Sequence, residues 1–521
     1  MAKFVIGIGG TGMRCLESFI HLCAMGMFGD EDIHILALDT DAKNGNFKRV
    51  DELAEAYKKI HKEEEKTKSK DTFFSSKISW YKFGPEYGPN CNFEKISQYG
   101  FAREKVLGNS GHRYKTTDLC ELFLTKEVRQ MDLEHGYRAQ TQMGSMLMYH
   151  AIIEAAYKHK KNPNGLGNFV EKLANCSKSK VFIFGSVFGG TGASSIPIIP
   201  RALDKAAKII NEKNSRNIID DNFFGASLLT NYFSFTRPSN KDNQVVASCD
   251  NFSLNSQAAL YFYAQDETIR KQYNRMYLIG RENMRDIITT NDSSDTGGAK
   301  QKNPVDYLEL LCATAAHDFF NDSEVKEDKD NRNSADHLPL YCRTISYENA
   351  LTERCFFDNE KTAWQFEKKL GMLISFDFLN SINSFASIMK EKGYDITEDE
   401  IKYLNEYFQY FYNLNSKEGW LYQMYESTRT SGDDLGGFLF NNAVFEFQKE
   451  FQYNKNLFTP KNDFFESTFK VGIFNNPNTN QLFDKVTEEF LKKETGEKNL
   501  SSLISGVYET FDSLFATKKI K

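Results

Sequence analysis

Residues 180–195 read KVFIFGSVFGGTGASS, and they carry the strongest indication of the fold. Its first half is β-branched and aromatic, which is typical of a buried strand. The strand runs directly into the glycine-rich turn at residues 189–192, and the pattern after it predicts a helix through residue 210 with Pro197 and Pro200 in its first turns. Such a unit is suited to phosphate, because glycine permits the tight turn and the helix N-terminus exposes backbone amides.

The N-terminus repeats this pattern. Residues 3–12 read KFVIGIGGTG, and apolar spacing over residues 13–28 predicts the following helix. Another apolar run, at residues 33–38, ends in Asp39-Thr40-Asp41 and is expected to be the next parallel strand, which ends at the same sheet edge. Two amide-rich turns at one edge suit the two ends of a nucleotide. Neither loop has the lysine spacing of a Walker-type ATPase, so that class is disfavoured.

The middle of the chain continues the alternation of strands and helices. Strands are predicted at residues 222–229 and 275–279, with a crossover helix at 255–270 between them. A further loop, residues 136–144, precedes a helical pattern. Asn303-Pro304 is expected to open a long buried helix, with proline at its first position. These elements predict an α/β domain of the Rossmann type.

The length of 521 residues exceeds what one hydrophobic core usually serves, so two domains are expected. The polar stretch at residues 321–336 is the predicted boundary. Residues 1–320 would form the nucleotide-binding domain, including the long central helix. Residues 321–521 would form a helix-rich C-terminal α+β domain, because Phe and Tyr recur at helical spacing over 360–450 and residues 469–474 have a strand pattern.

Composition narrows the class of protein. The net charge of −6 provides no cationic field for nucleic acid or for an anionic membrane. The nine cysteines are scattered and lack the spacing of a zinc site, which predicts a reduced, cytoplasmic protein. No apolar run approaches the roughly 20 residues of a membrane span, so no span is expected.

Several segments resemble the tubulin/FtsZ superfamily, in the family's order and over about residues 1–320. GIGGTGMRC (7–15) looks like the family's first loop, LDTDA (38–42) its second, GYRAQTQMG (136–144) its third, and GSVFGGTGASSIP (185–197) its phosphate signature. TNYFSF (230–235) looks like the segment that follows the next strand. Of this superfamily, the chain resembles the divergent bacterial tubulin-like proteins rather than FtsZ or eukaryotic tubulin. This resemblance implies a GTP-binding domain, a long central helix and head-to-tail assembly into filaments, with GTP or GDP and a magnesium ion on its phosphates.

The resemblance also implies which residues contact the nucleotide. They are Gly9, Gly10, Thr11, Gly12, Met13 and Arg14; then Asp39, Thr40 and Asp41; then Gly189, Gly190, Thr191, Gly192, Ala193 and Ser194; and finally Thr230, Asn231 and Asn303. The loop amides and the Thr191 hydroxyl would hold phosphates, and Thr230 and Asn231 would approach the ribose. Asp39 and Asp41 are acceptable beside phosphates where a cation or water intervenes. Asn303 either reads the guanine edge or is a plain helix N-cap.

Some positions depart from the family's pattern. Arg14 stands where the family has an asparagine near the base. Thr236, Arg237 and Pro238 stand where it has residues for the ribose and base, so ribose recognition must differ. Phe188 replaces a glycine of the phosphate signature, although the central Gly-Gly-Thr-Gly is intact.

The family's hydrolytic carboxylates lie on a loop after the central helix and act on the neighbouring subunit's nucleotide. Asp306 and Glu309 are candidates, because NPVDYLE (303–309) looks like that loop. We favour this segment as the start of the central helix itself, with both acids in its first turn, where they suit the helix dipole. The catalytic loop would then lie at about 322–353, with Asp336, Glu348 and Glu353 available.

Three functions follow, in order of preference. The first is a tubulin-like GTPase that self-associates head to tail, with the nucleotide at the subunit interface. The second is a GTP-binding scaffold or sensor that does not cycle, as the missing catalytic motif would allow. The third is a dinucleotide-dependent enzyme, supported by the first loop and by Asp39 as a ribose ligand.

Overall fold

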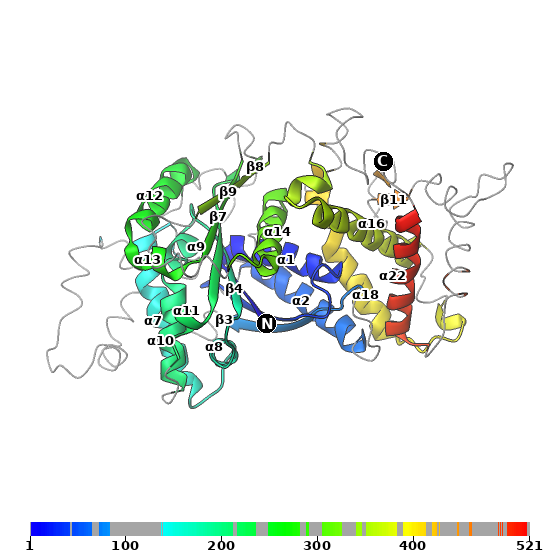
Figure 1. Cartoon of the computed structure of the whole chain (residues 1–521), viewed down its shortest axis with the longest axis horizontal. Helices are drawn as coiled ribbons and strands as arrows, with labels where there is room; N and C mark the ends of the chain where they lie inside the picture. The colour runs from blue at the N-terminus through cyan, green and yellow to red at the C-terminus, as the bar shows by residue number, and fades with distance from the viewer. Residues whose placement is uncertain are drawn as a thin grey trace, which may run out of the picture.

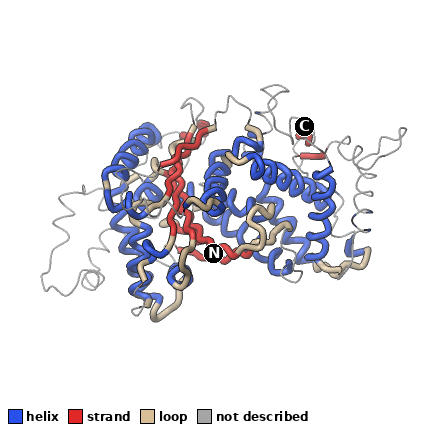
Figure 2. Tube along the Cα trace, in the orientation of Figure 1, coloured by secondary structure: helices blue, strands red, loops and turns tan. Residues whose placement is uncertain are grey.

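A parallel β-sheet forms the centre of the computed structural model, with helices on both of its faces (Figures 1 and 2). The structure describes residues 2–41, 44–64, 72–83, 125, 137, 139–211, 216–235, 248–281, 288–290, 305–325, 340–345, 351–382, 389–412, 419–421, 423–424, 427, 445–447, 458–460, 488, 490, 492 and 498–517. The sheet order is β3-β2-β1-β4-β5-β7-β9. Its strands are β1 (Lys3–Ile8), β2 (Asp32–Leu38), β3 (Lys77–Phe83), β4 (Lys180–Ser186), β5 (Phe223–Leu229), β7 (Arg275–Gly280) and β9 (Leu340–Thr344).

The helices follow the strands in alternation. They are α1 (Gly9–Ala24), α2 (Gly45–Glu64), α7 (Thr141–His159), α8 (Gly165–Ala174), α9 (Gly190–Ser195), α10 (Ile199–Ile210), α11 (Ile218–Asp221), α12 (Phe252–Gln265), α13 (Glu267–Gln272), α14 (Tyr307–Asn321), α16 (Glu360–Ile382), α18 (Glu398–Tyr412) and α22 (Leu500–Thr517), with 3-10 turns η1 (Cys249–Asn251) and η3 (Glu353–Phe356). Two small sheets pair β6 (Phe233–Phe235) with β8 (Ile288–Thr290), and β10 (Phe445–Phe447) with β11 (Phe458–Pro460). The predicted α/β class is confirmed.

The sheet separates two hydrophobic cores. One core lies against α1, α2 and α14 and continues into α16, α18 and α22; the other lies against α7, α8, α10 and α13. Every residue of β1, β4 and β5 is buried, which explains why these strands read as continuous apolar runs rather than alternating ones. The sheet also takes in β9, a strand from beyond residue 320 that the sequence did not predict.

The predicted central helix corresponds to α14, and both of its ends are fixed by side chains. It begins at Tyr307 with Asp306 as the N-cap, so the prediction that Pro304 is its first residue was wrong. Asp306 and Glu309 form a capping box. The Asp306 carboxylate accepts a hydrogen bond from the backbone amide of Glu309, and the Glu309 carboxylate accepts one from the backbone amide of Asp306. At the C-terminal end the buried Lys180 ammonium donates to the carbonyls of Phe319, Phe320 and Asp322 at 2.7–3.0 Å.

The connection through α14 has an unusual hand. The helices that lead from β4 to β5 and from β5 to β7 lie on one face of the sheet, whereas α14, between β7 and β9, lies on the other. All three connections advance across the sheet in the same direction, so the last has the opposite hand to the first two, against the general rule. As a result, α14 is enclosed between the sheet and the C-terminal helices (Figure 1).

Two other predicted helices are each divided into two shorter helices in the structure. The helix predicted through residue 210 is divided into α9 and α10, because Pro197 and Pro200 lack an amide proton and Pro200 lies at the start of the second helix. The helix predicted at 255–270 is divided at Asp266, whose carboxylate caps α13. The strand predicted at 469–474 lies outside the described residues.

Candidate functional site

The two glycine-rich loops meet at the point where the sheet changes direction. From β1 the chain proceeds outward to β2 and β3 and then returns to β4, which pairs with β1 on its other side. In open α/β sheets the crevice beyond the strands' carboxyl ends at such a switch point is where ligands bind. The loops after β1 and β4 lie at this switch point and touch, since a Cβ atom on Gly9 would lie 3.2 Å from the Cβ of Thr191.

The segment before α7 and the first turn of α7 lie against the second loop. A Cβ atom on Gly190 would lie 2.7 Å from the amide nitrogen of Ala139, and one on Gly144 would lie 2.6 Å from the Ser194 hydroxyl. Both distances are too short for any side chain, so these positions require glycine. The structure therefore brings together three of the segments on which the resemblance rested.

Side chains from neighbouring helices hold the carbonyl groups of the second loop. Asn255 and Tyr263 of α12 donate to the carbonyls of Phe188 and Ala193 at 3.3 and 2.5 Å. Ser145 of α7 donates to the carbonyl of Ser194 at 2.6 Å. These three hydrogen bonds hold the backbone of the loop in the observed conformation. Such preorganisation favours an anion at the loop's amides, because no reorganisation is needed on binding.

Both loops open onto helix ends that lack a side-chain cap. The N-cap residues of α1 and α9 are Ile8 and Gly189, and neither end has a side-chain cap hydrogen bond. By contrast, Asn164, Asp266 and Asp306 cap α8, α13 and α14 with their side chains. The first amides of a helix have no intrahelical acceptor, so an uncapped glycine-rich end is chemically suited to phosphate oxygens.

The predicted contact residues differ in their exposure to solvent. Those that keep solvent access are Gly10, Thr11, Gly189, Gly190, Thr191, Thr40 and Thr230. Those that are buried are Gly9, Gly12, Met13, Arg14, Asp39, Asp41, Gly192, Ala193, Ser194 and Asn231. Met13 is part of the hydrophobic core, and the Ser194 hydroxyl donates to the carbonyl of Thr191 at 3.0 Å. Asn303 lies outside the described residues.

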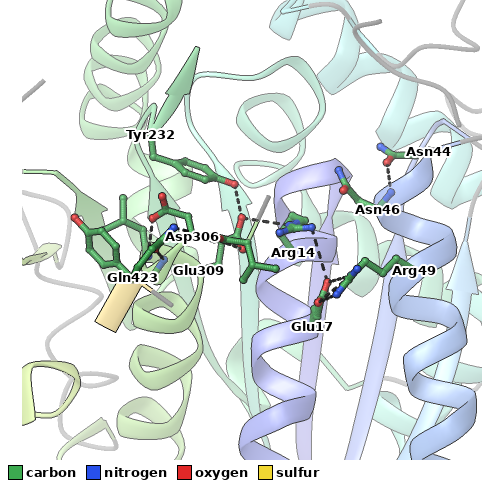
Figure 3. A network of polar contacts seen from close by, with 12 residues as sticks. Arg14, Glu17, Asn44, Asn46, Arg49, Tyr232, Asp306, Glu309 and Gln423 are labelled. Carbon is green, nitrogen blue, oxygen red and sulfur yellow. Dashed lines mark hydrogen bonds and ion pairs between the residues drawn. The ribbon is translucent and has the colours of Figure 1, made fainter. Parts of the chain in front are cut away.

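A pair of buried carboxylates follows β2, beside the first loop. Asp39 accepts hydrogen bonds from the backbone amide of Asp41 and from the side-chain amide of Asn44, at 3.1 and 3.0 Å. Asn44 in turn accepts from the amide of Asn46, which joins this segment to the start of α2 (Figure 3). Burial, together with the neighbouring Asp41 charge, raises the pKa of Asp39 to about 7. A fraction of Asp39 is therefore neutral at physiological pH.

A chain of buried charges connects the first loop to the central helix. Arg14, in the second turn of α1, contacts Glu309 of α14 at 3.4 Å and Glu17 at 4.0 Å (Figure 3). Tyr232, just after β5, donates to the same oxygen of Glu309 at 2.7 Å. Although burial opposes the charged form, Glu309 and Glu17 raise the pKa of Arg14. Burial raises the pKa of Glu309 to about 7, and Arg14 limits that rise.

The same chain of charges continues to α2 and α18. Arg49 of α2 holds Glu17 with three hydrogen bonds of 2.8–3.0 Å and donates to the carbonyl of Tyr410 at 3.1 Å. The Tyr410 hydroxyl donates to Glu52 at 2.7 Å. His21 of α1 also contacts the hydroxyl of Tyr407 in α18, at 3.0 Å. Polar contacts thus join α18, from the C-terminal part of the chain, to α1 and α2.

The candidate carboxylates are internal to the fold. Asp306 is 3% exposed, caps α14 and pairs with Arg281; Glu309 is fully buried. Glu309 lies in the first turn of α14, as we favoured, whereas Asp306 is the N-cap that precedes this turn. Asp336 and Glu348 lie outside the described residues, and Glu353 lies in η3 with its side chain undescribed.

Sequence reasoning missed the residues that support the site. Arg49, Tyr263, Ser145 and Arg281 come from distant parts of the chain and belong to no motif. Arg49 is one of several basic residues on α2, so its position in the sequence carried no signal. Its partner Glu17 could not be identified without the packing of α1 on α2.

No protein-family model matches this sequence, and no curated protein matches it. None of the helices in the described part of the chain is both long and apolar enough to cross a membrane. Among the described residues, no group of three or more His, Cys, Asp or Glu side chains is arranged to hold a metal ion.

Proposed function

We propose that this chain binds a guanine nucleotide between residues 9–12 and 189–194, and that it acts as a tubulin-like GTPase assembling head to tail. The observation that carries this proposal is the contact between Gly9 and Thr191 at the switch point of the sheet. Two uncapped, glycine-rich helix ends thus lie side by side at one edge of the sheet. The assignment of guanine, rather than another base, rests on the order of the sequence motifs.

The residues of the chain have distinct parts in this proposal. The amides near Gly10, Thr11, Gly190 and Thr191 would donate to phosphate oxygens, with the helix dipoles favouring negative charge. The raised pKa of Asp39 reduces its repulsion of phosphates. A magnesium ion, when bound through the phosphates, would neutralise part of their charge. Bound nucleotide at a heterologous interface would then favour open filaments.

A second candidate, a GTP-binding scaffold or sensor that does not cycle, is favoured by one observation. Asp306 and Glu309 are buried and internally paired, so neither carboxylate is placed to act on a neighbouring subunit's nucleotide. The dinucleotide-dependent enzyme has less support. The carboxylate of Asp39 that would bind a ribose is buried and accepts hydrogen bonds from Asn44 and Asp41.

Identification of the nucleotide that co-purifies with the protein tests all three. Mass spectrometry of a denatured sample should detect GDP or GTP. Recovery of a dinucleotide would support the enzyme instead. Tight GTP retention with no release of phosphate over hours would favour the scaffold over the GTPase.

Assembly is tested by sedimentation in GTP, ATP or no nucleotide. We expect GTP with magnesium, and not ATP, to increase the pelleted fraction. Gly190→Ala combined with Thr191→Ala should abolish that increase, because a Cβ atom at position 190 would lie 2.7 Å from the Ala139 amide nitrogen. A nucleotide response in neither assembly nor thermal stability would exclude the proposal.

A further inference from the structure

Arg14 is the least well satisfied residue of the buried charge chain. Its contacts with Glu309 and Glu17 are long, at 3.4 and 4.0 Å, and its Nη2 atom is buried without a hydrogen-bond partner. Arg49, on the same chain of charges, holds Glu17 with bonds of 2.8–3.0 Å. A buried donor without an acceptor is costly, so Arg14 would gain from any new acceptor brought near it.

The position of Arg14 is suited to a ligand at the loops. It lies two residues after Gly12, in the second turn of α1. In the structure its guanidinium contacts Glu309 and Glu17 (Figure 3). Because Cα–Cβ bonds of a helix tilt toward its N-terminus, another rotamer of this long side chain would reach the glycine-rich turn. A hydrogen bond from the charged arginine guanidinium to a phosphate oxygen is stronger than a hydrogen bond between two neutral groups.

Glu309 would respond if Arg14 moved. Around it are Arg14 and Cys15 from α1, Tyr232 from the segment after β5, and Asp306 and Cys312 from its own helix region, with Arg281 beyond Asp306. Within the described structure, Arg14 supplies the positive charge in contact with Glu309. With that charge withdrawn, burial and the Asp306 carboxylate would both favour the protonated form of Glu309.

We propose that phosphate binding at the loops draws Arg14 from Glu309 to the ligand, and that Glu309 takes up a proton from solvent as it loses its cation. This inference rests on the proposed nucleotide site and adds its regulation. No covalent bond changes: one N–H···O contact is exchanged for another, and the carboxylate becomes a carboxylic acid. Nucleotide affinity then depends on pH through a residue of the central helix.

The test is isothermal titration with magnesium-GTP in buffers of different ionisation enthalpy, at about pH 7.5, close to the pKa of Glu309. Wild-type protein should take up protons on binding. Glu309→Gln should not, and it should bind severalfold more tightly, because Arg14 no longer leaves a carboxylate. Glutamine retains the capping box and can accept the Tyr232 hydrogen bond. Arg14→Met should bind about tenfold or more weakly, as loss of a charge-assisted hydrogen bond predicts.

Two controls separate this inference from simpler causes. Asp39 also has a pKa of about 7 and lies nearer the predicted phosphates, so Asp39→Asn is the matched variant, and it should retain the proton uptake due to Glu309. Guanosine, which lacks phosphates, should produce none. Should Glu309→Gln fail to fold, Asp39→Asn still tests the inference, because its GTP affinity should weaken from about pH 7 to pH 8.5.

The outcomes are distinguishable. Proton uptake that persists in Glu309→Gln, or that guanosine also produces, overturns the inference and leaves nucleotide binding intact. A pH-independent GTP affinity in Asp39→Asn has the same meaning. An absence of heat and of thermal stabilisation with GTP in the wild-type protein overturns both the inference and the nucleotide site.

Discussion

Gly9 lies against Thr191 where the two glycine-rich loops meet, and a Cβ atom on Gly9 would be 3.2 Å from the Cβ of Thr191. Gly9 also has a φ of +66°, in the left-handed region that other residues adopt at a cost. We expect Gly9→Ala to lower the free energy of unfolding by about 1–2 kcal/mol and to weaken GTP binding at least tenfold. Urea unfolding and titration calorimetry measure the two effects.

Gly393 provides the control for this change. Its φ is +92°, and the structure shows nothing within 4 Å of the Cβ that alanine would add there. Gly393→Ala should lose a similar amount of stability and keep its GTP affinity. Equal loss of GTP affinity in both variants would contradict a specific role for the Gly9–Thr191 contact.

Tyr263 and Tyr273 form a matched pair that tests whether hydrogen bonds to the carbonyls of the second loop matter for binding. Tyr263 donates to the carbonyl of Ala193, inside the loop, and Tyr273 to that of Ile196, just beyond it. Each change to Phe should cost about 1–3 kcal/mol, because a buried carbonyl loses its donor. Tyr263→Phe should reduce GTP affinity more than Tyr273→Phe does. Identical affinities would show that the loop conformation does not depend on this hydrogen bond.

The stability of the protein should fall as pH rises through 7, in part because of Asp39. Its folded pKa is about 7, above the ordinary value, so the folded state holds a proton that the unfolded state has lost between about pH 4 and 7. Asp39→Asn removes this penalty. The melting temperature of the variant minus that of wild type should therefore become more positive from pH 5 to pH 8. A constant difference over this range would argue against a raised pKa.

Removal of Arg49 should expose the cost of an unpaired buried charge. Glu17 has a 3% exposed side chain and relies on Arg49 for its three short hydrogen bonds. We expect Arg49→Met to cost about 3 kcal/mol, and Glu17→Gln in the same protein to recover much of that loss. Urea unfolding of the two single variants and the double variant measures the coupling. Additive losses would mean that the two side chains are independent.

Particular local patterns made parts of this fold predictable. The strand-turn-helix units at β1 and β4 could be identified because a fully buried parallel strand, a glycine turn and an apolar helix face are all local properties. The weak strands β3 and β9 were missed because they have few fully buried positions and therefore little apolar pattern. The start of α14 was misplaced because Asn303 and Asp306 are both good N-caps, and its end depends on Lys180, more than 100 residues away.

The α/β class, the two glycine-rich turns and their position at the ends of strands could be predicted from local sequence. They depend on backbone freedom and on the periodicity of apolar residues, which are properties of neighbours along the chain. Three contacts emerged from the folded chain alone: the two turns touch at Gly9 and Thr191, Arg14 faces Glu309, and Arg49 binds α18. Those contacts link residues up to several hundred positions apart. They follow from the strand order and from the packing of helices on one face of the sheet, which local sequence does not specify.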